Sequence, residues 1–171
     1  MMRRRTLASC MALPVVTSLL FLGAARPAVH VASMDSVGPR EMEQQTRTAI
    51  VRDYLQAWRC MGSAFEHNQA DSLDPCFVGQ AKETLAHTVG EQQSLDIQTS
   101  YRDRSHDLRV LFYSPEGLSI QLLDDAEYDV EVQQRGKSLG TQHVRSRYVA
   151  VLTPTESKWK VRIFQGGNGF Q

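Results

Sequence analysis

The chain lacks the spacings that mark common catalytic and metal sites. It contains no HExxH, no GxSxG, no phosphate-cradling glycine loop, no CxxC pair and no cysteine–histidine cluster. We therefore expect neither a metal nor a cofactor. Any function must depend on residues that only the fold brings together, because a fold by itself does not specify an activity.

An excess of charge of either sign is also missing. The 171 residues carry 19 basic and 19 acidic side chains, and three of the basic ones are Arg3, Arg4 and Arg5. After residue 25 the chain is mildly acidic. This balance excludes the basic surface that nucleic acids require, and no basic helix favours an anionic membrane.

Cysteine is scarce, with three residues in the chain. Cys10 lies in an N-terminal segment that we expect to be removed, which leaves Cys60 and Cys76. In an exported chain such a pair can form a disulfide, which would contribute about 3 kcal/mol by closing a short loop. The alternative is a pair of half-buried thiols on neighbouring helices.

A long apolar run occurs only near the start, from Leu7 to Ala25, directly after the three arginines. This layout is typical of a secretory signal, with the small residues Gly23 to Ala25 available for cleavage, so residues 1–25 predict a periplasmic or extracellular protein. One alternative is an uncleaved helix in which residues 7–25 tether the chain to a membrane. Another is a transit peptide to an organelle lumen.

Helical periodicity follows a linker without a pattern at residues 26–40. From about residue 40 to 67, apolar side chains recur at intervals of three and four and predict one long amphipathic helix. Asp74 and Pro75 then indicate the N-cap and first turn of a second helix, which we expect to continue to about Val89 and to stop at Gly90.

Beyond residue 93 the apolar period changes to two, which predicts strands. We expect two short strands, one around Leu95 to Tyr101 and one over Leu108 to Phe112. Longer strands follow over residues 118–132, 144–152 and 159–163, and residues 166–171 form a tail. Asp124 interrupts the apolar row of residues 118–132, so this segment is either one strand with an inward carboxylate or two strands separated by a bulge.

Two helices followed by antiparallel strands predict an α+β domain in which the N-terminal helices pack on a curved antiparallel sheet. The order of elements, with the closing segments Tyr148 to Leu152 and Lys158 to Ile163, resembles the nuclear transport factor 2-like superfamily. The segment from Leu73 to Gly79 is similar to the inner-envelope C-terminal domain of chloroplast-division proteins. The resemblance spans residues 41–165 and implies a cone with an apolar pocket between helix and sheet.

The resemblance covers both enzymes and binding proteins, so the inward polar residues have two interpretations. Asp124 could act as a base, with Tyr128 or Tyr148 as the hydrogen-bond donor. Alternatively, Asp124 accepts backbone hydrogen bonds at a bulge and both tyrosines are core residues. His106 shares the parity of Leu108, but its polar neighbours favour a polar strand start.

Two further groups of residues are candidates for binding. Tyr54, Trp58 and Trp159 could line a pocket for a small apolar ligand. Basic side chains on the last two strands could form a partner surface: Arg145, Arg147, Lys158 and Lys160. The alternative for this row is cross-strand pairing with acids of the preceding strand.

The sequence favours an exported, non-catalytic binding or assembly domain of the cell envelope. Its partner would be a protein or a small apolar ligand, with a homodimer through the open face of the sheet as one form of assembly. The alternative is a small cofactor-free isomerase or dehydratase that uses Asp124.

Overall fold

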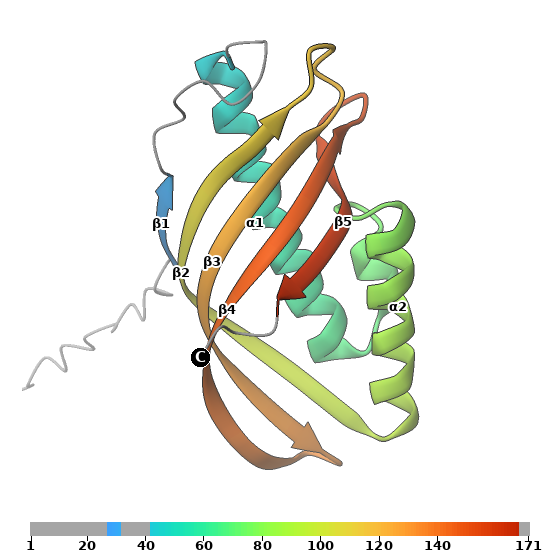
Figure 1. Ribbon diagram of the computed structural model, residues 1–171. Coiled ribbons are helices and arrows are strands. Elements are labelled where there is room, and N and C mark those ends of the chain that lie inside the picture. Colours follow the sequence, from blue (N-terminus) through green and yellow to red (C-terminus); the bar gives the residue numbers. More distant parts are fainter. Residues whose placement is uncertain (1–26, 32–41, 168–171) are drawn as a thin grey trace, which may run out of the picture.

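The computed structural model describes residues 27–31 and 42–167 of the chain (Figure 1). The segments predicted as signal or anchor (1–25) and most of the linker and tail lie outside the described residues. The elements in chain order are β1 (Ala28–Val31), α1 (Gln44–His67), a 3-10 turn (Ala70–Leu73), α2 (Gly79–Ser94), β2 (Ile97–Tyr113), β3 (Ile120–Gln134), β4 (Lys137–Pro154) and β5 (Trp159–Gly167).

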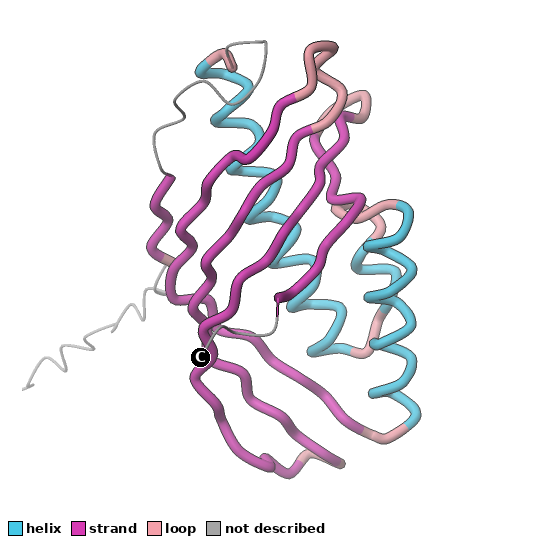
Figure 2. Tube along the Cα trace, viewed as in Figure 1, coloured by secondary structure: helices cyan, strands magenta, loops and turns pink. Residues whose placement is uncertain are grey.

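The strands form one curved five-stranded sheet in the order β1-β2-β3-β4-β5 (Figure 2). Neighbours from β2 to β5 are antiparallel, as the sequence predicts, and β1 adds to the edge of β2 in parallel. The sequence predicted no regular structure at Ala28–Val31. Four residues are too few to show a period, so only the adjacent edge of β2 reveals this strand.

Helix α1 lies across one face of the sheet, and α2 packs beside it near β5 (Figure 1). The side of α1 that faces the sheet is buried and carries the apolar residues that the periodicity indicated: Ile50, Tyr54, Trp58, Met61 and Phe65. We call the face of the sheet directed away from α1 the outer face.

The second helix differs from its prediction at both ends. It begins at Gly79 after the extended residue Val78 and continues through Gly90 to Ser94. Asp74 instead follows the 3-10 turn, and the chain then runs extended beside β5, where the Val78 N–H donates to the Val161 carbonyl at 2.9 Å. The contact with β5 therefore overrides the local capping signal, because it satisfies backbone groups of an edge strand.

Strand β2 is one strand of 17 residues where the sequence predicted two short ones. Its pairing with β3 shifts register between Asp103 and Ser105 and again between Val110 and Phe112. Each shift changes which parity of residue faces the helix, because one extra residue moves the following side chains to the opposite face. Tyr101 and His106 thus both point inward, whereas Phe112 is 43% exposed.

The hairpin between β3 and β4 closes at the turn predicted from Gln134 to Lys137. Arg135 and Gly136 have φ values of 51° and 74°. Two successive residues with positive φ are typical of the hairpin turns whose twist matches that of the strands. This turn sets the register in which every outward residue of β3 meets a defined residue of β4.

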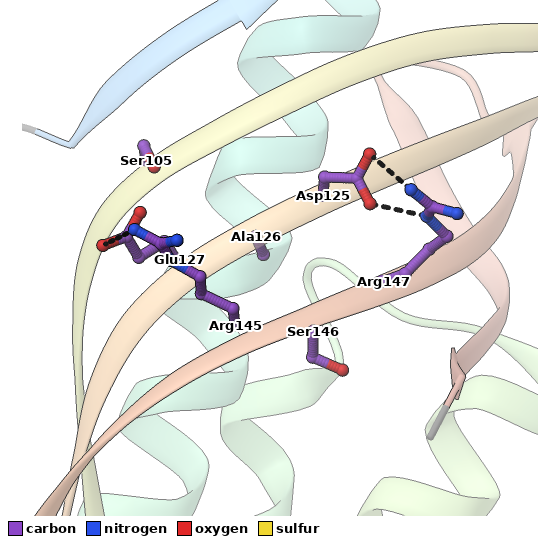
Figure 3. Close-up of a pocket in the computed structure, with 7 residues that line it drawn as sticks. All are labelled: Ser105, Asp125, Ala126, Glu127, Arg145, Ser146 and Arg147. Atoms are coloured by element: carbon purple, nitrogen blue, oxygen red, sulfur yellow. Dashed lines mark hydrogen bonds and ion pairs between the residues drawn. The ribbon is translucent and has the colours of Figure 1, made fainter. Parts of the chain in front are cut away.

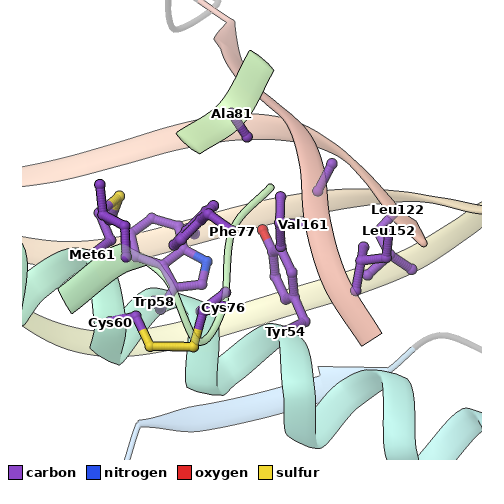
Figure 4. Packing of buried hydrophobic residues seen from close by; sticks show 14 of the residues in the cluster. Tyr54, Trp58, Cys60, Met61, Cys76, Phe77, Ala81, Leu122, Leu152 and Val161 are labelled. Carbon is purple, nitrogen blue, oxygen red and sulfur yellow. A yellow bond between two sulfur atoms is a disulfide. The ribbon is translucent and has the colours of Figure 1, made fainter. Parts of the chain in front are cut away.

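A disulfide joins Cys60 of α1 to Cys76, just before α2 (Figure 4). Both cysteines are buried beside Trp58 and Phe77. The disulfide therefore holds the segment that borders β5 against the long helix. The sequence left open whether these cysteines form a disulfide or remain two free thiols, and the structure contains the disulfide.

Replacement of Cys60 and Cys76 by alanine should lower the free energy of unfolding by about 3 kcal/mol, because the unfolded chain loses a cross-link over a short loop. Urea denaturation of the double variant and of the unreduced protein measures this difference. A reducing agent should lower the stability of the original protein only. Equal stability of variant and original protein would contradict a structural role for the disulfide.

Candidate functional site

The candidate site is built around Asp124, which lies at the middle of β3 and points toward α1. Its side chain is fully buried. The Tyr54 hydroxyl donates to Asp124 Oδ2 at 2.9 Å, and His106 Nδ1 lies 2.8 Å from the same oxygen. The three residues come from α1, β2 and β3, so the contact joins the helix to two strands.

Strand β3 continues through Asp124 without a break. Its pairing with β4 shifts only near the hairpin, between Val132 and Gln133. Of the two readings from the sequence, the structure has the unbroken strand with an inward carboxylate. The expectation that Asp124 accepts backbone hydrogen bonds at a bulge is wrong, because its partners are the side chains of Tyr54 and His106.

His106 is the residue of this site that the sequence analysis misplaced. It was expected at a polar strand start, yet it is 1% exposed. The bulge after Asp103 explains the error, because it lets a histidine among polar neighbours turn inward. Its shared parity with Leu108 and Val110, both buried, was the signal that could have identified it.

Burial and neighbouring carboxylates shift the pKa values of His106 and Tyr54 in this cluster. Burial by itself lowers the pKa of His106, but the attraction of the nearby Asp103 carboxylate and the hydrogen bond to Asp124, with its charge, outweigh it and raise this pKa to about 9. Burial, with the nearby Asp124 carboxylate, raises the pKa of the Tyr54 hydroxyl well above its usual value. At neutral pH the cluster therefore contains a buried imidazolium and a phenol that keeps its proton.

Three polar atoms of the cluster are buried without a hydrogen-bond partner among the described residues: Trp58 Nε1, His106 Nε2 and Asp124 Oδ1. The ring centroids of Trp58 and His106 are 4.9 Å apart, and His106 Nε2 lies 3.9 Å from the nearer carboxylate oxygen of Asp103. A carboxylate beside an imidazole can accept or relay a proton from a bound molecule, provided that the molecule can reach it.

Tyr128 and Tyr148 were predicted to share a site with Asp124, and the structure places them nearby without joining them to it. Their hydroxyls bond to each other. The ring of Tyr148 stacks on Phe164 with centroids 4.9 Å apart, and a Cβ atom at Gly166 would come within 3.1 Å of it. Tyr54 therefore occupies the donor position that the sequence analysis assigned to one of these tyrosines.

The residues proposed to line an apolar pocket are dispersed. Tyr54 and Trp58 belong to the packed core, and Trp159 is half-buried at the start of β5. The Trp159 backbone N–H donates to Asp53 Oδ2 at 2.8 Å, which fixes β5 to α1. Four of the hollows along the described residues are lined by other side chains, and neither these aromatic residues nor Asp124 borders any of the four.

The predicted basic row separates into two pairs. Arg147 bonds to Asp125 with its Nε atom 2.6 Å from Oδ1, and Arg145 lies 3.4 Å from Glu127 on the outer face (Figure 3). Lys160 instead donates to the Asp74 carbonyl at 2.9 Å. Lys158 and Lys160 lie near Thr153 of β4, six residues along that strand from Arg147.

A shallow hollow of about 320 Å³ lies on the outer face (Figure 3). Its walls carry the side chains of two acids and two arginines: Asp125, Glu127, Arg145 and Arg147. Ser105, at the bulge of β2, completes the wall next to Glu127. No group of three metal-binding side chains occurs in the described residues.

No family model matches the chain, and no curated protein matches it. Among solved structures it is similar to the intermembrane space region of the chloroplast protein ARC6, with 15% identity and a TM-score of 0.59 over 74% of this chain and 98% of that one. It is also similar to a candidate scytalone dehydratase of Novosphingobium aromaticivorans, with 11% identity and a TM-score of 0.51 over 74% and 89%.

A candidate aromatic ring hydroxylase of the same organism is similar at 15% identity and a TM-score of 0.50, over 74% of this chain and 96% of the other. These similarities confirm the predicted fold, an α+β cone of the nuclear transport factor 2-like type. Along residues 27–31 and 42–167, no helix is long and apolar enough to cross a membrane.

The His106 cluster should make stability depend on pH. Because the folded pKa of about 9 exceeds the usual 6.5, His106 contributes stability that is complete below about pH 6.5 and is lost as the pH rises through 9. The original protein should therefore lose up to about 3 kcal/mol of its advantage in free energy of unfolding over His106→Gln as the pH rises across this range. Urea unfolding at a series of pH values measures it.

The matched control is His87→Gln, because His87 is exposed on α2. Its stability difference from the original protein should stay small at every pH. A His106→Gln difference that is constant from pH 6 to pH 10 would show that the imidazole is not charged in the folded protein.

Proposed function

We propose that the chain is a non-catalytic binding domain that works in an oxidising compartment outside the cytosol and binds a protein partner on its outer face. The observation that carries the proposal is the closure of the candidate site. Asp124 and His106 are 0% and 1% exposed, and four hollows of the described surface lie elsewhere. None of these four hollows gives a substrate a path to the carboxylate.

The compartment is supported by the disulfide and by the N-terminal pattern. Disulfides persist mainly in oxidising environments and are rare in the cytosol. The bond between Cys60 and Cys76 fits the secretory layout of residues 1–25. The similarity to the intermembrane space region of ARC6 concerns the fold and agrees with such a location.

The outer face is favoured as the binding surface because it combines charged and apolar residues beyond the cover of the helices. Toward the turn between β2 and β3, five of its outward residues are apolar and half-buried or exposed: Phe112, Leu123, Val149, Val151 and Ile163. Next to them lie Asp125 and Arg147. An apolar patch bordered by polar residues is typical of a protein interaction site.

A second function, a small cofactor-free isomerase or dehydratase, is favoured by one observation. Asp124 Oδ1 and His106 Nε2 are both buried without a partner among the described residues, and such atoms are uncommon in native proteins. In that case Asp124 would act as the base and Tyr54 as the hydrogen-bond donor. This enzymatic function requires the core to open between α1 and the sheet, so that a substrate can reach Asp124.

A photo-crosslinking residue distinguishes the two functions. Placed at Val149 on the outer face, it should form protein adducts in cells that produce the chain, whereas the same residue at Glu83, exposed on α2, should form few. Asp124→Asn should leave the Val149 adducts unchanged, since this carboxylate would not touch the partner. The analysis is by denaturing electrophoresis and mass spectrometry of the adducts.

Absence of adducts from Val149 would contradict the proposed binding surface. A small molecule that remains bound in native mass spectra of the original protein, and is lost from a folded Asp124→Asn variant, would instead support the enzyme. The melting temperature of each variant shows whether it is folded.

A further inference from the structure

A hollow of about 420 Å³ lies at the edge of the sheet, between the end of β1 and the first turns of α1 (Figure 1). Its volume is within the range of small-ligand sites, about 300–1,000 Å³. One residue of β1 and five of α1 line it: Val31, Gln44, Arg47, Thr48, Val51 and Arg52. Neither the Asp124 cluster nor any residue of the outer face borders this hollow, which we call the edge pocket.

The helical repeat brings the α1 residues of the edge pocket together. Gln44, Thr48 and Arg52 follow one another at intervals of four, and Arg47 and Val51 do the same, so all five share one side of the helix. The opposite wall is the last residue of β1, whose register partner on β2 is Leu108. The edge pocket therefore exists because β1 is added to the sheet.

The charge of the edge pocket is positive. Two guanidinium groups line it, those of Arg47 and Arg52, and no acidic side chain does. Nε of Arg47 is buried without a hydrogen-bond partner among the described residues. Such a donor is costly to bury, because it has given up its bond to water. An anion in the edge pocket would supply the missing acceptor.

The second arginine is held in place but not used up. Arg52 donates from Nε to Asp53 Oδ1 at 2.8 Å, and its side chain remains 64% exposed. The guanidinium group has further N–H donors in the same plane. The first turn of α1 contains no acidic residue, so the positive end of the helix adds to the charge of the two arginines.

The edge pocket also has an apolar part. Val31 and Val51 are half-buried and pack against the hydrophobic core, and each contributes to the lining. The Thr48 hydroxyl donates to the Gln44 carbonyl at 3.0 Å, so its proton is already engaged within the helix. An inorganic anion would pair with the arginines and leave the valines uncovered, whereas an anion with an apolar chain would cover both.

We propose that the edge pocket binds a small carboxylate with an apolar chain, of the chemical class of a medium-chain fatty acid. The two carboxylate oxygens accept hydrogen bonds from Arg47, assisted by Arg52, because a guanidinium group matches a carboxylate in shape and charge. The chain lies on Val31 and Val51. This ligand and a protein partner on the outer face would occupy different parts of the molecule, so either can bind without the other.

Octanoate is the probe that tests the proposal, by isothermal titration calorimetry. The original protein should bind it with a Kd below about 1 mM. Acetate, which has the same carboxylate without the chain, should bind at least about tenfold more weakly, since it covers no apolar surface. Methyl NMR signals of Val31 and Val51 should shift as octanoate is added, which places the ligand in the edge pocket.

Two variants remove binding in different ways. Arg47→Gln should weaken octanoate binding at least about tenfold, because a charge-assisted hydrogen bond is lost. Thr48→Glu should weaken it at least as much, since the new carboxylate lies four residues before Arg52 and pairs with it along the helix. This second variant adds an ion pair to α1, so its melting temperature should not fall.

Each variant has a matched control. Arg59→Gln makes the same change as Arg47→Gln at an exposed position of α1 outside the edge pocket. Thr88→Glu matches Thr48→Glu, because Thr88 is exposed on α2 and also donates to the carbonyl four residues earlier. Both controls should bind octanoate as the original protein does.

Three results would overturn the proposal. One is an original protein that binds no octanoate up to about 5 mM. Another is a folded Arg47→Gln variant that binds octanoate as tightly as the original protein. The third is inorganic phosphate that binds as tightly as octanoate, which would show that the edge pocket recognises charge without an apolar chain. None of these results bears on the Val149 crosslinks, so the proposed protein-binding function is tested separately.

Discussion

The structure depends most on the contact between the long helix and one carboxylate in the middle of the sheet. Burying a charge costs several kcal/mol unless the charge is paired and hydrogen-bonded. Asp124 meets that requirement with Tyr54 from α1 and His106 from β2. Because these partners come from different elements, the helix cannot leave the sheet, nor β2 change register, without exposing or unpairing the carboxylate.

The same constraint decides how the two faces of the sheet are used. The inner face is occupied by α1, the aromatic residues around Trp58 and the buried cluster, so little of its centre remains for a ligand. The outer face carries ordered columns of charge beside an apolar patch. We propose binding through the outer face because the inner face is already filled.

The sequence predicted the fold well where a single period extends over many residues. The apolar row from Ile50 to Phe65 defined α1, and the alternation from Ile120 to Val132 defined β3, with Asp124 as its inward exception. The predictions failed where tertiary contacts override a local signal. The bulges of β2 interrupt its period, and pairing with β5 displaces the start of α2 from Pro75 to Gly79.

The candidate site was likewise predictable only in the part that one periodic segment reveals. Asp124 could be identified from one strand, because parity alone places it inside. Its partners could not, since Tyr54 lies 70 residues away and His106 faces inward only because of a bulge. The row of basic residues was recognisable as a group, yet the register between β4 and β5 separates Arg147 from Lys160.

The central claim is that the Asp124–His106 pair is closed to solvent and serves structure rather than catalysis. Nitrogen-resolved NMR of the histidine rings tests it most directly, through the exchange of the His106 ring protons with water at neutral pH. Our account predicts two ring N–H signals from a charged His106 that exchange slowly, in contrast to those of exposed His143. Ring protons of His106 that exchange as fast as those of His143 would show an open site and contradict the account.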